Sequence, residues 1–409
     1  MGSHLHIAGK VRGEVVRISD GIATVIPFGT WEGISAGDRA DMIEDDGVIR
    51  PDITWIGRVL DAFGNPLGDY APTEGPVGYP YKANPPDALA RRRVGEKLET
   101  AIKALDVFIP VCRGQRLGIF AGSGVGKSTT MAMLARQINV DVIVMGLVGE
   151  RGREVQDFIE RDLGPEGMAR SVLIVATSDQ PSLMRRQAAW TATSVAEYFR
   201  DQGLNVLLMI DSVTRFAMAQ REIGLAAHEP PTTKGYTPTV FSELPRLLER
   251  SGPGNPEKNQ GDITAIYTVL VDGDDMNEPI ADAVRGILDG HIILDRKIAQ
   301  RGRYPAIDIL RSVSRMLPHC HTAAENAIMS RARMALDVSS EMEELAQIGA
   351  YQEGSKPDVD AAMAFAREAY EFLKQGTRAG LSSAESFANL YGLLESAGIA
   401  PGAEELAGD

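Results

Sequence analysis

Residues 121–129 read Ala-Gly-Ser-Gly-Val-Gly-Lys-Ser-Thr, and this stretch is the most informative part of the chain for its fold. The apolar run Leu117-Gly118-Ile119-Phe120 precedes it, and a helix-compatible segment over 129–137 follows it. A strand, a glycine loop ending in Gly-Lys-Ser and then a helix form the sequence context of a phosphate-binding P-loop. Glycines let the backbone curl until several N–H groups face one anion, and the positive end of the helix strengthens that field. A glycine-rich turn without a ligand is the alternative, and the flanking strand and helix weigh against it.

The side chains of this loop are predicted to bind different parts of the nucleotide and its metal ion. The ammonium group of Lys127 reaches the β- and γ-phosphates, and the hydroxyl of Ser128 suits a Mg²⁺ ligand. Ala121 stands where the strict pattern has glycine. The residues predicted to bind the nucleotide here are Gly122, Ser123, Gly124, Val125, Gly126, Lys127, Ser128 and Thr129. The sequence therefore predicts a protein that binds a nucleoside triphosphate, with Mg²⁺ as the metal.

The composition is that of an ordinary globular protein, and the length suggests two or three domains. Of the 409 residues, 44% are hydrophobic and 24% charged, and the formal net charge is -14. An acidic chain is a poor general binder of nucleic acid, so we expect no nucleic-acid partner. The two cysteines, Cys112 and Cys320, stand apart from any Cys/His cluster, which favours a reduced, cytoplasmic protein and disfavours a zinc site.

The first part of the chain is rich in short β-forming runs. We interpret Met1-Gly2-Ser3-His4 as the remnant of an affinity tag. Residues 5–69 carry β-rich runs at 14–18, 22–28 and 53–60, separated by Gly and Asp turns, which predict a small β-barrel or part of one. Residues 70–94 are proline-rich and are predicted to form a linker over the surface.

From 95 to 318, apolar runs alternate with amphipathic helical segments. The runs are 117–120, 142–148, 172–176, 206–210, 263–271 and 292–294. Fully apolar runs of this length are typical of parallel strands buried on both faces, so we predict a doubly wound α/β domain. Its ligand is expected at the carboxyl ends of the strands. Residues 319–409 are predicted to be α-helical, with helices over 323–334, 340–348 and 359–374.

Two strand ends carry candidate groups for chemistry on the bound phosphates. The run 206–210 ends in Asp211, as in a Walker B strand whose Asp holds Mg²⁺ directly or through water; an Asp that only forms a turn is the alternative. Glu150 follows the run 142–148, where a carboxylate can orient and polarise an attacking water. A solvated charged turn is equally compatible with the residues around Glu150. Arg315, in Ser-Val-Ser-Arg, is by itself an ordinary surface or salt-bridging arginine.

Longer motifs carry a resemblance to a known family. They are Gly-Arg-Val-Leu-Asp-Ala-Phe-Gly-Asn-Pro-Leu at 57–67, the P-loop and its preceding strand at 113–128, Gly-Tyr-Thr-Pro-Thr-Val-Phe-Ser-Glu-Leu-Pro-Arg-Leu-Leu-Glu-Arg-Ser-Gly at 235–252, Asp-Gly-His-Ile-Ile-Leu-Asp-Arg at 289–296 and Tyr-Pro-Ala-Ile-Asp at 304–308. The chain resembles the hexameric rotary ATPases, and most closely the flagellar and type III secretion export ATPases. Met342-Glu-Glu-Leu345 and Ile348-Gly-Ala-Tyr351 are similar to the export branch. The resemblance extends from about residue 9 to 395.

The resemblance implies a fold and a set of site residues. The fold is a RecA-like P-loop domain with a parallel sheet, preceded by a truncated β-barrel and followed by an α-helical domain. Since the family's barrel begins with further strands and a helical segment, we expect the start of the barrel to be missing from this chain. The implied site residues are Lys127 and Ser128 on phosphate and Mg²⁺, Glu150 as catalytic glutamate, Asp211 as Walker B acid, Arg151 and Arg215 near the γ-phosphate, Tyr304 stacked on adenine, and Arg315 as an arginine finger given to the neighbouring subunit.

The function that this resemblance implies is Mg-dependent ATP hydrolysis that energises or regulates flagellar protein export in a homohexameric ring. The implied partners are an export regulator, stalk proteins and chaperone–cargo complexes, with peripheral association at the inner face of the membrane. A virulence-type export ATPase and a catalytic subunit of a rotary synthase are alternatives. A non-catalytic nucleotide-binding subunit would lack a carboxylate at Glu150, and a ring-shaped RNA translocase is disfavoured by the acidic composition.

Overall fold

The computed structural model describes residues 2–43, 47–71, 73–271, 273, 275–347, 351–352, 354–378 and 380–407, without the side chains of 344–347. The chain forms two compact units. The first unit comprises Met1–Val94, Gly114–Gly118 and Val140–Leu288, and the second comprises Gly95–Arg113, Ile119–Asn139 and Asp289–Asp409. Each unit is therefore built from segments that lie far apart in the sequence.

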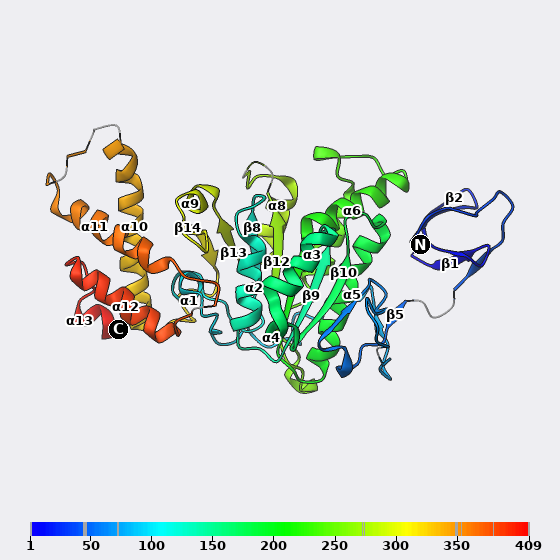
Figure 1. The fold of residues 1–409 in the computed structure, drawn as a ribbon, viewed down its shortest axis with the longest axis horizontal. Coiled ribbons are helices and arrows are strands. Elements are labelled where there is room, and N and C mark those ends of the chain that lie inside the picture. Colours follow the sequence, from blue (N-terminus) through cyan, green and yellow to red (C-terminus); the bar gives the residue numbers. More distant parts are fainter. Residues whose placement is uncertain are drawn as a thin grey trace. The chain divides into compact units, whose positions relative to one another are not determined.

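Among the described residues, eight strands form one sheet in the order β14-β13-β8-β12-β11-β9-β10-β6 (Figure 1). These strands are β6 (Arg58–Leu60), β8 (Arg116–Ala121), β9 (Val142–Val148), β10 (Ser171–Ala176), β11 (Val206–Asp211), β12 (Ile263–Leu270), β13 (Gly290–Leu294) and β14 (Ile307–Ser314). In the first unit, β12, β11, β9, β10 and β6 pair in parallel. Every residue of β9, β10 and β11 is buried, as expected for strands covered on both faces. The predicted α/β class with a mostly parallel sheet is confirmed.

The strand β14 is absent from the sequence-based prediction. It pairs antiparallel with β13 and lies at the end of the strand order. Its residues alternate between buried and more exposed positions, whereas the prediction relied on fully apolar runs. An edge strand needs only one apolar face, so it lacks that signal.

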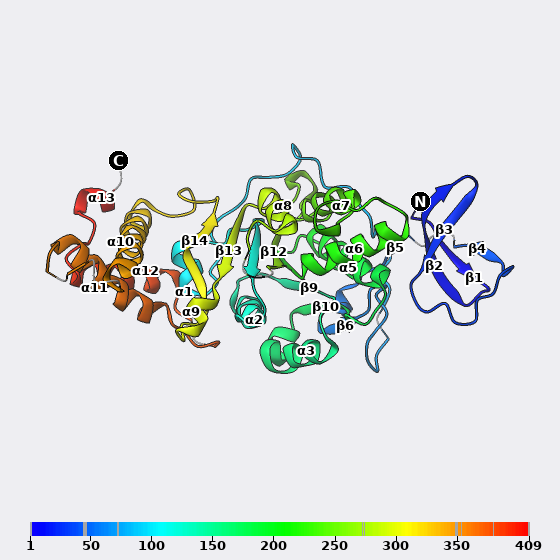
Figure 2. The same cartoon turned by 90° about the horizontal axis from the view of Figure 1, so that it is seen from above.

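Four strands near the beginning of the chain form an antiparallel sheet of their own, in the order β3-β2-β1-β4 (Figure 2). They are β1 (His4–Ile7), β2 (Val11–Ser19), β3 (Ile22–Pro27) and β4 (Ala40–Met42). A further antiparallel pair consists of β5 (Val48–Ile49) and β7 (Tyr79–Pro80). His4, which the interpretation as a tag remnant sets aside, is buried in β1 and accepts a hydrogen bond from Arg12 at 3.1 Å.

The run 53–60, which we expected within the barrel, lies elsewhere. It forms the 3-10 turn η1 (Ile53–Trp55) and then β6, which pairs in parallel with β10. The outer edge of β10 would otherwise present unpaired backbone N–H and C=O groups, and β6 satisfies them. A short apolar run does not reveal which sheet it joins, because either sheet offers it a similar apolar surface.

Helices make up the rest of both units. In the first unit they are α3 (Gly152–Asp157), the π-helix η2 (Phe158–Leu163), α4 (Gly164–Met168), α5 (Ser182–Asp201), α6 (Val213–Ala226), η3 (Thr233–Gly235), α7 (Pro238–Leu248), η4 (Pro256–Lys258) and α8 (Pro279–Ile287). In the second unit they are α1 (Lys103–Phe108), α2 (Lys127–Gln137), α9 (Arg296–Gln300), α10 (Ala323–Gln347), α11 (Pro357–Leu373), α12 (Ser383–Ser396) and α13 (Ala403–Ala407). No helix in the described part of the chain has the length and apolar character needed to cross a membrane.

The end of the second unit is all-helical, and Figure 1 shows α10 to α13 gathered there in orange and red. The two helices predicted over 323–334 and 340–348 are a single helix, α10. No glycine or proline separates them, so nothing local ends the first. Residues 348–350, which begin the second export-branch motif of this region, lie outside the described residues.

Arg250, in the motif at 235–252, forms a buried ion pair with a residue outside the motif. Arg250 is 2% exposed, and its Nε and Nη2 donate to the two carboxylate oxygens of Glu197 on α5 at 2.9 and 2.6 Å. Its Nη1 donates to the carbonyl of Tyr81 at 2.5 Å. A bidentate pair of this kind has a fixed geometry, so it holds the end of the α7 region against α5.

Replacing Arg250 with methionine is expected to lower the free energy of unfolding of the first unit by about 3–5 kcal/mol, because Glu197 is left buried without its partner. Denaturation followed by tryptophan fluorescence measures this, since Trp31, Trp55 and Trp190 all belong to that unit. Arg246→Met is the control: its ion pair with Glu243 is formed by a guanidinium that is 68% exposed, and its loss costs under about 1 kcal/mol. Equal losses in the two variants would show that the buried pair is not important for stability.

Candidate active site

The P-loop of the second unit has the backbone of a phosphate cradle. Gly124 and Gly126 have φ values of 77° and 100°, in the left-handed region that glycine adopts without strain. Gly126 is the residue before α2, which begins at Lys127, and its carbonyl accepts from the N–H of Thr130 at 3.0 Å. The first N–H groups of a helix have no partner within the helix. They are therefore available to the phosphate oxygens of a nucleotide.

Tyr304 lies against this loop in the same unit. A Cβ atom added to Gly126 would lie 3.8 Å from two ring carbons of Tyr304. The side chain is 48% exposed, and its carbonyl accepts from the N–H of Gln375 at 3.0 Å. An exposed aromatic face beside a phosphate loop suits a purine base. The structure thus brings together the predicted base-binding and phosphate-binding residues.

The predicted Walker B residue, Asp211, ends β11 in the first unit and is 5% exposed. Its Oδ1 accepts a 2.6 Å hydrogen bond from Oγ1 of Thr268, a fully buried residue of the neighbouring strand β12. A short hydrogen bond from a hydroxyl to a carboxylate is a strong one, and it holds the carboxylate in a single orientation. The sequence analysis missed Thr268. The available signal was a polar residue within an otherwise apolar strand.

Replacing Thr268 with valine, which has the same shape, is expected to lower kcat for ATP about tenfold, because Asp211 loses a hydrogen bond to a charged group. The variant should also need more Mg²⁺ for half-maximal binding of a fluorescent ATP analogue. Thr268→Ser keeps the hydroxyl and should behave like the unaltered protein. A Thr268→Val protein with unchanged kcat and Mg²⁺ dependence would show that this hydrogen bond has no part in catalysis.

Glu150 follows β9 and is half-buried. The glycine before it, Gly149, has a φ of 71°, and a Cβ there would lie 2.9 Å from the Cβ of Arg215. Glycine is therefore required for Arg215 to lie against this strand end. The backbone carbonyl of Glu150 accepts from the N–H of Ser178 at 2.9 Å, which fixes the main chain at the carboxylate.

The two arginines assigned to the γ-phosphate region differ in their surroundings. Arg215 is half-buried on α6, and within the described residues its buried Nε has no hydrogen-bond partner. A buried guanidinium N–H without a partner fits an anionic ligand such as a phosphate. Arg151 is exposed and donates to Glu154 at 2.8 Å.

The residues predicted to hold Mg²⁺ are Ser128, on the first turn of α2, and Asp211. The described residues contain no group of three or more His, Cys, Asp or Glu side chains that could hold a metal ion alone. One hydroxyl and one carboxylate leave most positions of an octahedral Mg²⁺ ion to water and phosphate oxygens. A Mg²⁺ site that uses these two side chains therefore stays a prediction.

Arg315 follows the end of β14 and is exposed. Its backbone N–H donates to the carbonyl of Asp289 at 2.9 Å, which continues the pairing between β13 and β14. Its side chain makes no hydrogen bond or ion pair with any residue that the structure describes. The main chain of Arg315 is therefore held in place, while its exposed guanidinium is accessible to another molecule.

Comparison with known proteins identifies the family of the chain. The model of the "ATP synthase alpha/beta family, nucleotide-binding domain" matches residues 101–314, which is more than half of the chain. The chain belongs to this family. A second model, the "T3SS EscN ATPase C-terminal domain", matches residues 322–392. The helical region is thus similar to that of the type III secretion branch of the family.

Individual members of the family agree with this placement. The "Flagellum-specific ATP synthase" of Caulobacter vibrioides is 53% identical over 388 residues, which cover 94% of this chain and 87% of the relative. The "Type 3 secretion system ATPase" of Xanthomonas euvesicatoria is 46% identical over 366 residues, which cover 90% and 82%. These relatives confirm the resemblance to the flagellar and type III export ATPases.

Solved structures of the family share the fold. The assembled ATPase EscN of the enteropathogenic E. coli type III secretion system matches with a TM-score of 0.91 and 40% identity, over 96% of this chain and 95% of that chain. The structure of EscN in complex with its central stalk EscO matches with a TM-score of 0.87 and the same identity and coverage. The RecA-like fold expected for this chain is thereby confirmed.

Proposed function

We propose that this chain hydrolyses Mg-ATP to energise or regulate flagellar protein export. Hydrolysis of ATP is the reaction of its family branch. The observation that carries the proposal is that the P-loop glycine Gly126 lies against the ring of Tyr304. The loop is suited to the phosphates of a nucleotide, and the ring is suited to its base. The flagellar rather than the virulence system is favoured, since four flagellar relatives, at 47% to 53% identity, are more similar to the chain than the virulence relative at 46%.

The residue roles follow from the chemistry of phosphoryl transfer. The N–H groups of the P-loop and the ammonium of Lys127 bind the β- and γ-phosphates and neutralise charge that develops on them. Ser128 and Asp211 would hold Mg²⁺, which would supply the positive charge that polarises the phosphoryl oxygens. The carboxylate of Glu150 orients a water molecule for in-line attack and polarises it. The resemblance to the export ATPases implies that these groups serve one nucleotide.

The remaining cations act on the transferred phosphoryl group. The buried Nε of Arg215 donates toward the γ-phosphate region, and Arg151 reaches the same region after releasing its exposed pairing with Glu154. Such an exposed pair is weak, so exchanging it for a phosphate contact costs little. Both arginines thereby stabilise the charge of the transition state.

We propose that the working form is a homohexameric ring in which Arg315 of one subunit reaches the ATP of its neighbour. The exposed guanidinium, unpaired among the described residues, supports this role, as does the assembled form of EscN. A stalk protein is a proposed partner because EscN binds EscO. We also propose that the protein binds an export regulator and chaperone–cargo complexes. Its proposed location is the cytoplasm, at the inner face of the membrane.

Mixing two inactive variants tests the ring and the role of Arg315. Arg315→Ala alone should lose about a thousandfold or more in kcat, as for other arginine fingers, and Lys127→Ala alone should be inactive. In a mixed ring, some interfaces pair an intact P-loop with an intact Arg315 from the neighbour, so ATPase activity should partly return. Mixed rings that are confirmed by mass and stay inactive would contradict a finger acting between subunits, as would full activity of Arg315→Ala alone.

A further inference from the structure

The strand that leads to Arg315 is irregular. In the pairing of β13 with β14, His291 is opposite Val313 and Ile293 is opposite Asp308. Two steps along β13 thus correspond to five along β14, which makes a bulge in β14 between these pairs. Bulges bend a strand and redirect the side chains that follow. In β14, the redirected side chains are those of the residues immediately before Arg315.

Side chains take over the backbone hydrogen bonds within the bulge. Oδ1 of Asp308 accepts from the N–H groups of Leu310 and Arg311, both at 3.1 Å. Oγ of Ser312 donates to the carbonyl of Asp308 at 2.5 Å and accepts from the N–H of Ile293 at 2.9 Å. Since backbone polar groups need partners, these side chains define one conformation of the bulge.

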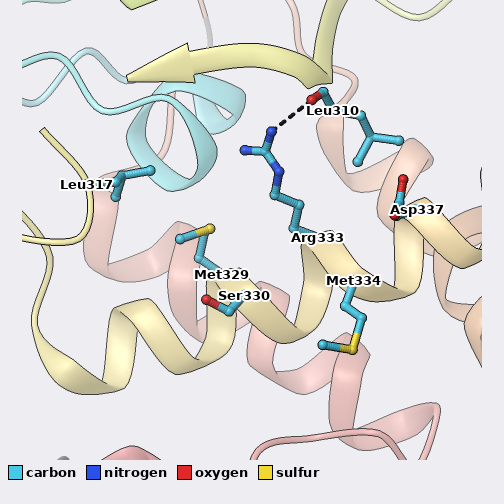
Figure 3. A pocket seen from close by; sticks show the side chains of 7 residues that line it. All are labelled: Leu310, Leu317, Met329, Ser330, Arg333, Met334 and Asp337. Carbon is cyan, nitrogen blue, oxygen red and sulfur yellow. Dashed lines mark hydrogen bonds between the residues drawn. The ribbon is translucent and has the colours of Figure 1, made fainter. Parts of the chain in front are cut away.

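The carbonyls of the bulge are bound from outside the strand. Nη2 of Arg333, on helix α10, donates to the carbonyl of Leu310 at 2.8 Å and to that of Ser312 at 3.3 Å. Figure 3 shows the guanidinium extending from the helix to the strand, with the bond to Leu310 drawn as a dashed line. A charged donor makes stronger hydrogen bonds than a neutral one. Arg333 therefore ties α10 directly to the bulge.

An open pocket lies beside this link. Its volume is about 440 Å³, and its lining includes Leu317, Met329 and Met334 together with Arg333 (Figure 3). Met334 is exposed. A closely packed interface would hold the helix and the strand together through many contacts, and the pocket removes part of that packing. The hydrogen bonds of Arg333 thus form a direct link between β14 and α10 beside this pocket.

We propose that Arg333 is a positioning residue that sets the direction of Arg315 through the bulge in β14. The bulge lies between Tyr304, which binds the base in its own subunit, and Arg315, which is offered to a neighbour. A displacement of α10 would pass through Arg333 to the bulge and change where Arg315 points. Because α10 belongs to the helical region, events at that region are thereby transmitted to ATP hydrolysis in the next subunit. The inference rests on the proposed role of Arg315.

Replacing Arg333 with methionine tests the link. In assembled rings, kcat should fall about tenfold, the effect of losing hydrogen bonds from one charged donor. The KM for ATP should change less than twofold, because Lys127 and Tyr304 of the same subunit are unaltered. Arg331→Met is the control on the same helix: Arg331 pairs with Glu405 at 2.9 Å near the surface, and its loss should change neither constant. An unchanged kcat in Arg333→Met would overturn the proposal.

Mixed rings separate positioning of Arg315 from a general defect. If Arg333 acts through Arg315, mixed rings of Arg333→Met and Lys127→Ala should have more than half of the ATPase activity of rings made of Arg333→Met alone. The reason is that Lys127→Ala subunits supply a well-placed Arg315 to their Arg333→Met neighbours. Recovery with Arg315→Ala and Lys127→Ala, but not with Arg333→Met and Lys127→Ala, overturns only this inference. If neither pair recovers, the role of Arg315 between subunits is wrong and the inference falls with it.

A variant with smaller structural consequences covers the case in which Arg333→Met does not fold. Arg333→Lys keeps the charge and still offers one nitrogen to the two carbonyls that Nη2 of Arg333 binds, but its shorter, more flexible side chain holds that nitrogen there less firmly. Its kcat should lie between those of the unaltered protein and Arg333→Met, at an unchanged melting temperature. A kcat equal to that of the unaltered protein in folded Arg333→Lys rings, with the Arg333→Met protein unfolded, would also overturn the proposal.

Discussion

Replacing Lys127 with alanine is expected to abolish ATP hydrolysis while the protein stays folded. Lys127 begins α2 directly after the left-handed Gly126, so its ammonium extends from the end of the P-loop. The group stabilises negative charge on the transferred phosphoryl, and alanine has no charge to replace it. Loss of one such electrostatic contact typically costs about 100-fold or more in kcat. Steady-state phosphate release, with circular dichroism as a check of folding, measures the effect.

The matched control for this prediction lies on the same helix. Arg136→Ala also removes one positive charge from α2, but from its last turn, where Arg136 donates to the carbonyl of Thr377 at 2.7 Å. Its turnover should stay close to that of the unaltered protein. Comparable turnover in a folded Lys127→Ala protein would mean that 121–129 is not the nucleotide site.

Replacing Glu150 with glutamine is expected to separate ATP binding from ATP hydrolysis. The amide keeps the size of the side chain but loses the charge that polarises the attacking water. Positioned bases of this kind contribute about 10²- to 10⁴-fold, so kcat should fall by that factor. Affinity for Mg-ATP should change little, because the P-loop and Tyr304 are intact. Rings with ATP trapped in them should accumulate, and filter binding with labelled ATP measures the retained nucleotide.

A nearby carboxylate provides the control for Glu150. Glu154 lies on α3, and it accepts from the exposed Arg151 at 2.8 Å, so Glu154→Gln removes a negative charge close to the same strand end. This variant should retain turnover within a few-fold of the unaltered protein. If Glu150→Gln retains it too, another group orients the attacking water.

The candidate site could be predicted from the sequence where its residues follow directly from local patterns. The P-loop is contiguous, and Glu150 and Asp211 come at the ends of apolar runs that are strands in the structure. Parallel strands place their carboxyl ends at one edge of a sheet, so the sequence order predicts that these residues lie together. The roles of Tyr304 and Arg315 came only from the resemblance to the family, because neither lies in a local pattern that points to ATP.

Thr268 and Arg333 were missed for a related reason. Thr268 lies 57 positions from the Asp211 that it binds, and Arg333 lies 23 positions from Leu310. Both partners of each pair are ordinary for their elements: a threonine in a strand and an arginine on a helix. Their importance comes from the partner, and the partner is known only once the strands and helices have packed.

The α/β class, most of the strands and the phosphate loop could be predicted from the sequence alone, because periodicity, glycine placement and apolar runs are local properties of the chain. Tertiary structure decided that residues 58–60 join the large sheet, that β14 forms an antiparallel edge, and that Thr268 orients Asp211. It also decided that α10 reaches the bulge before Arg315 through Arg333. Edge strands and buried hydrogen bonds form between groups on segments that are distant in the sequence. Which segment pairs with which depends on the backbone and carboxylate groups that still need a partner when the strands and helices pack.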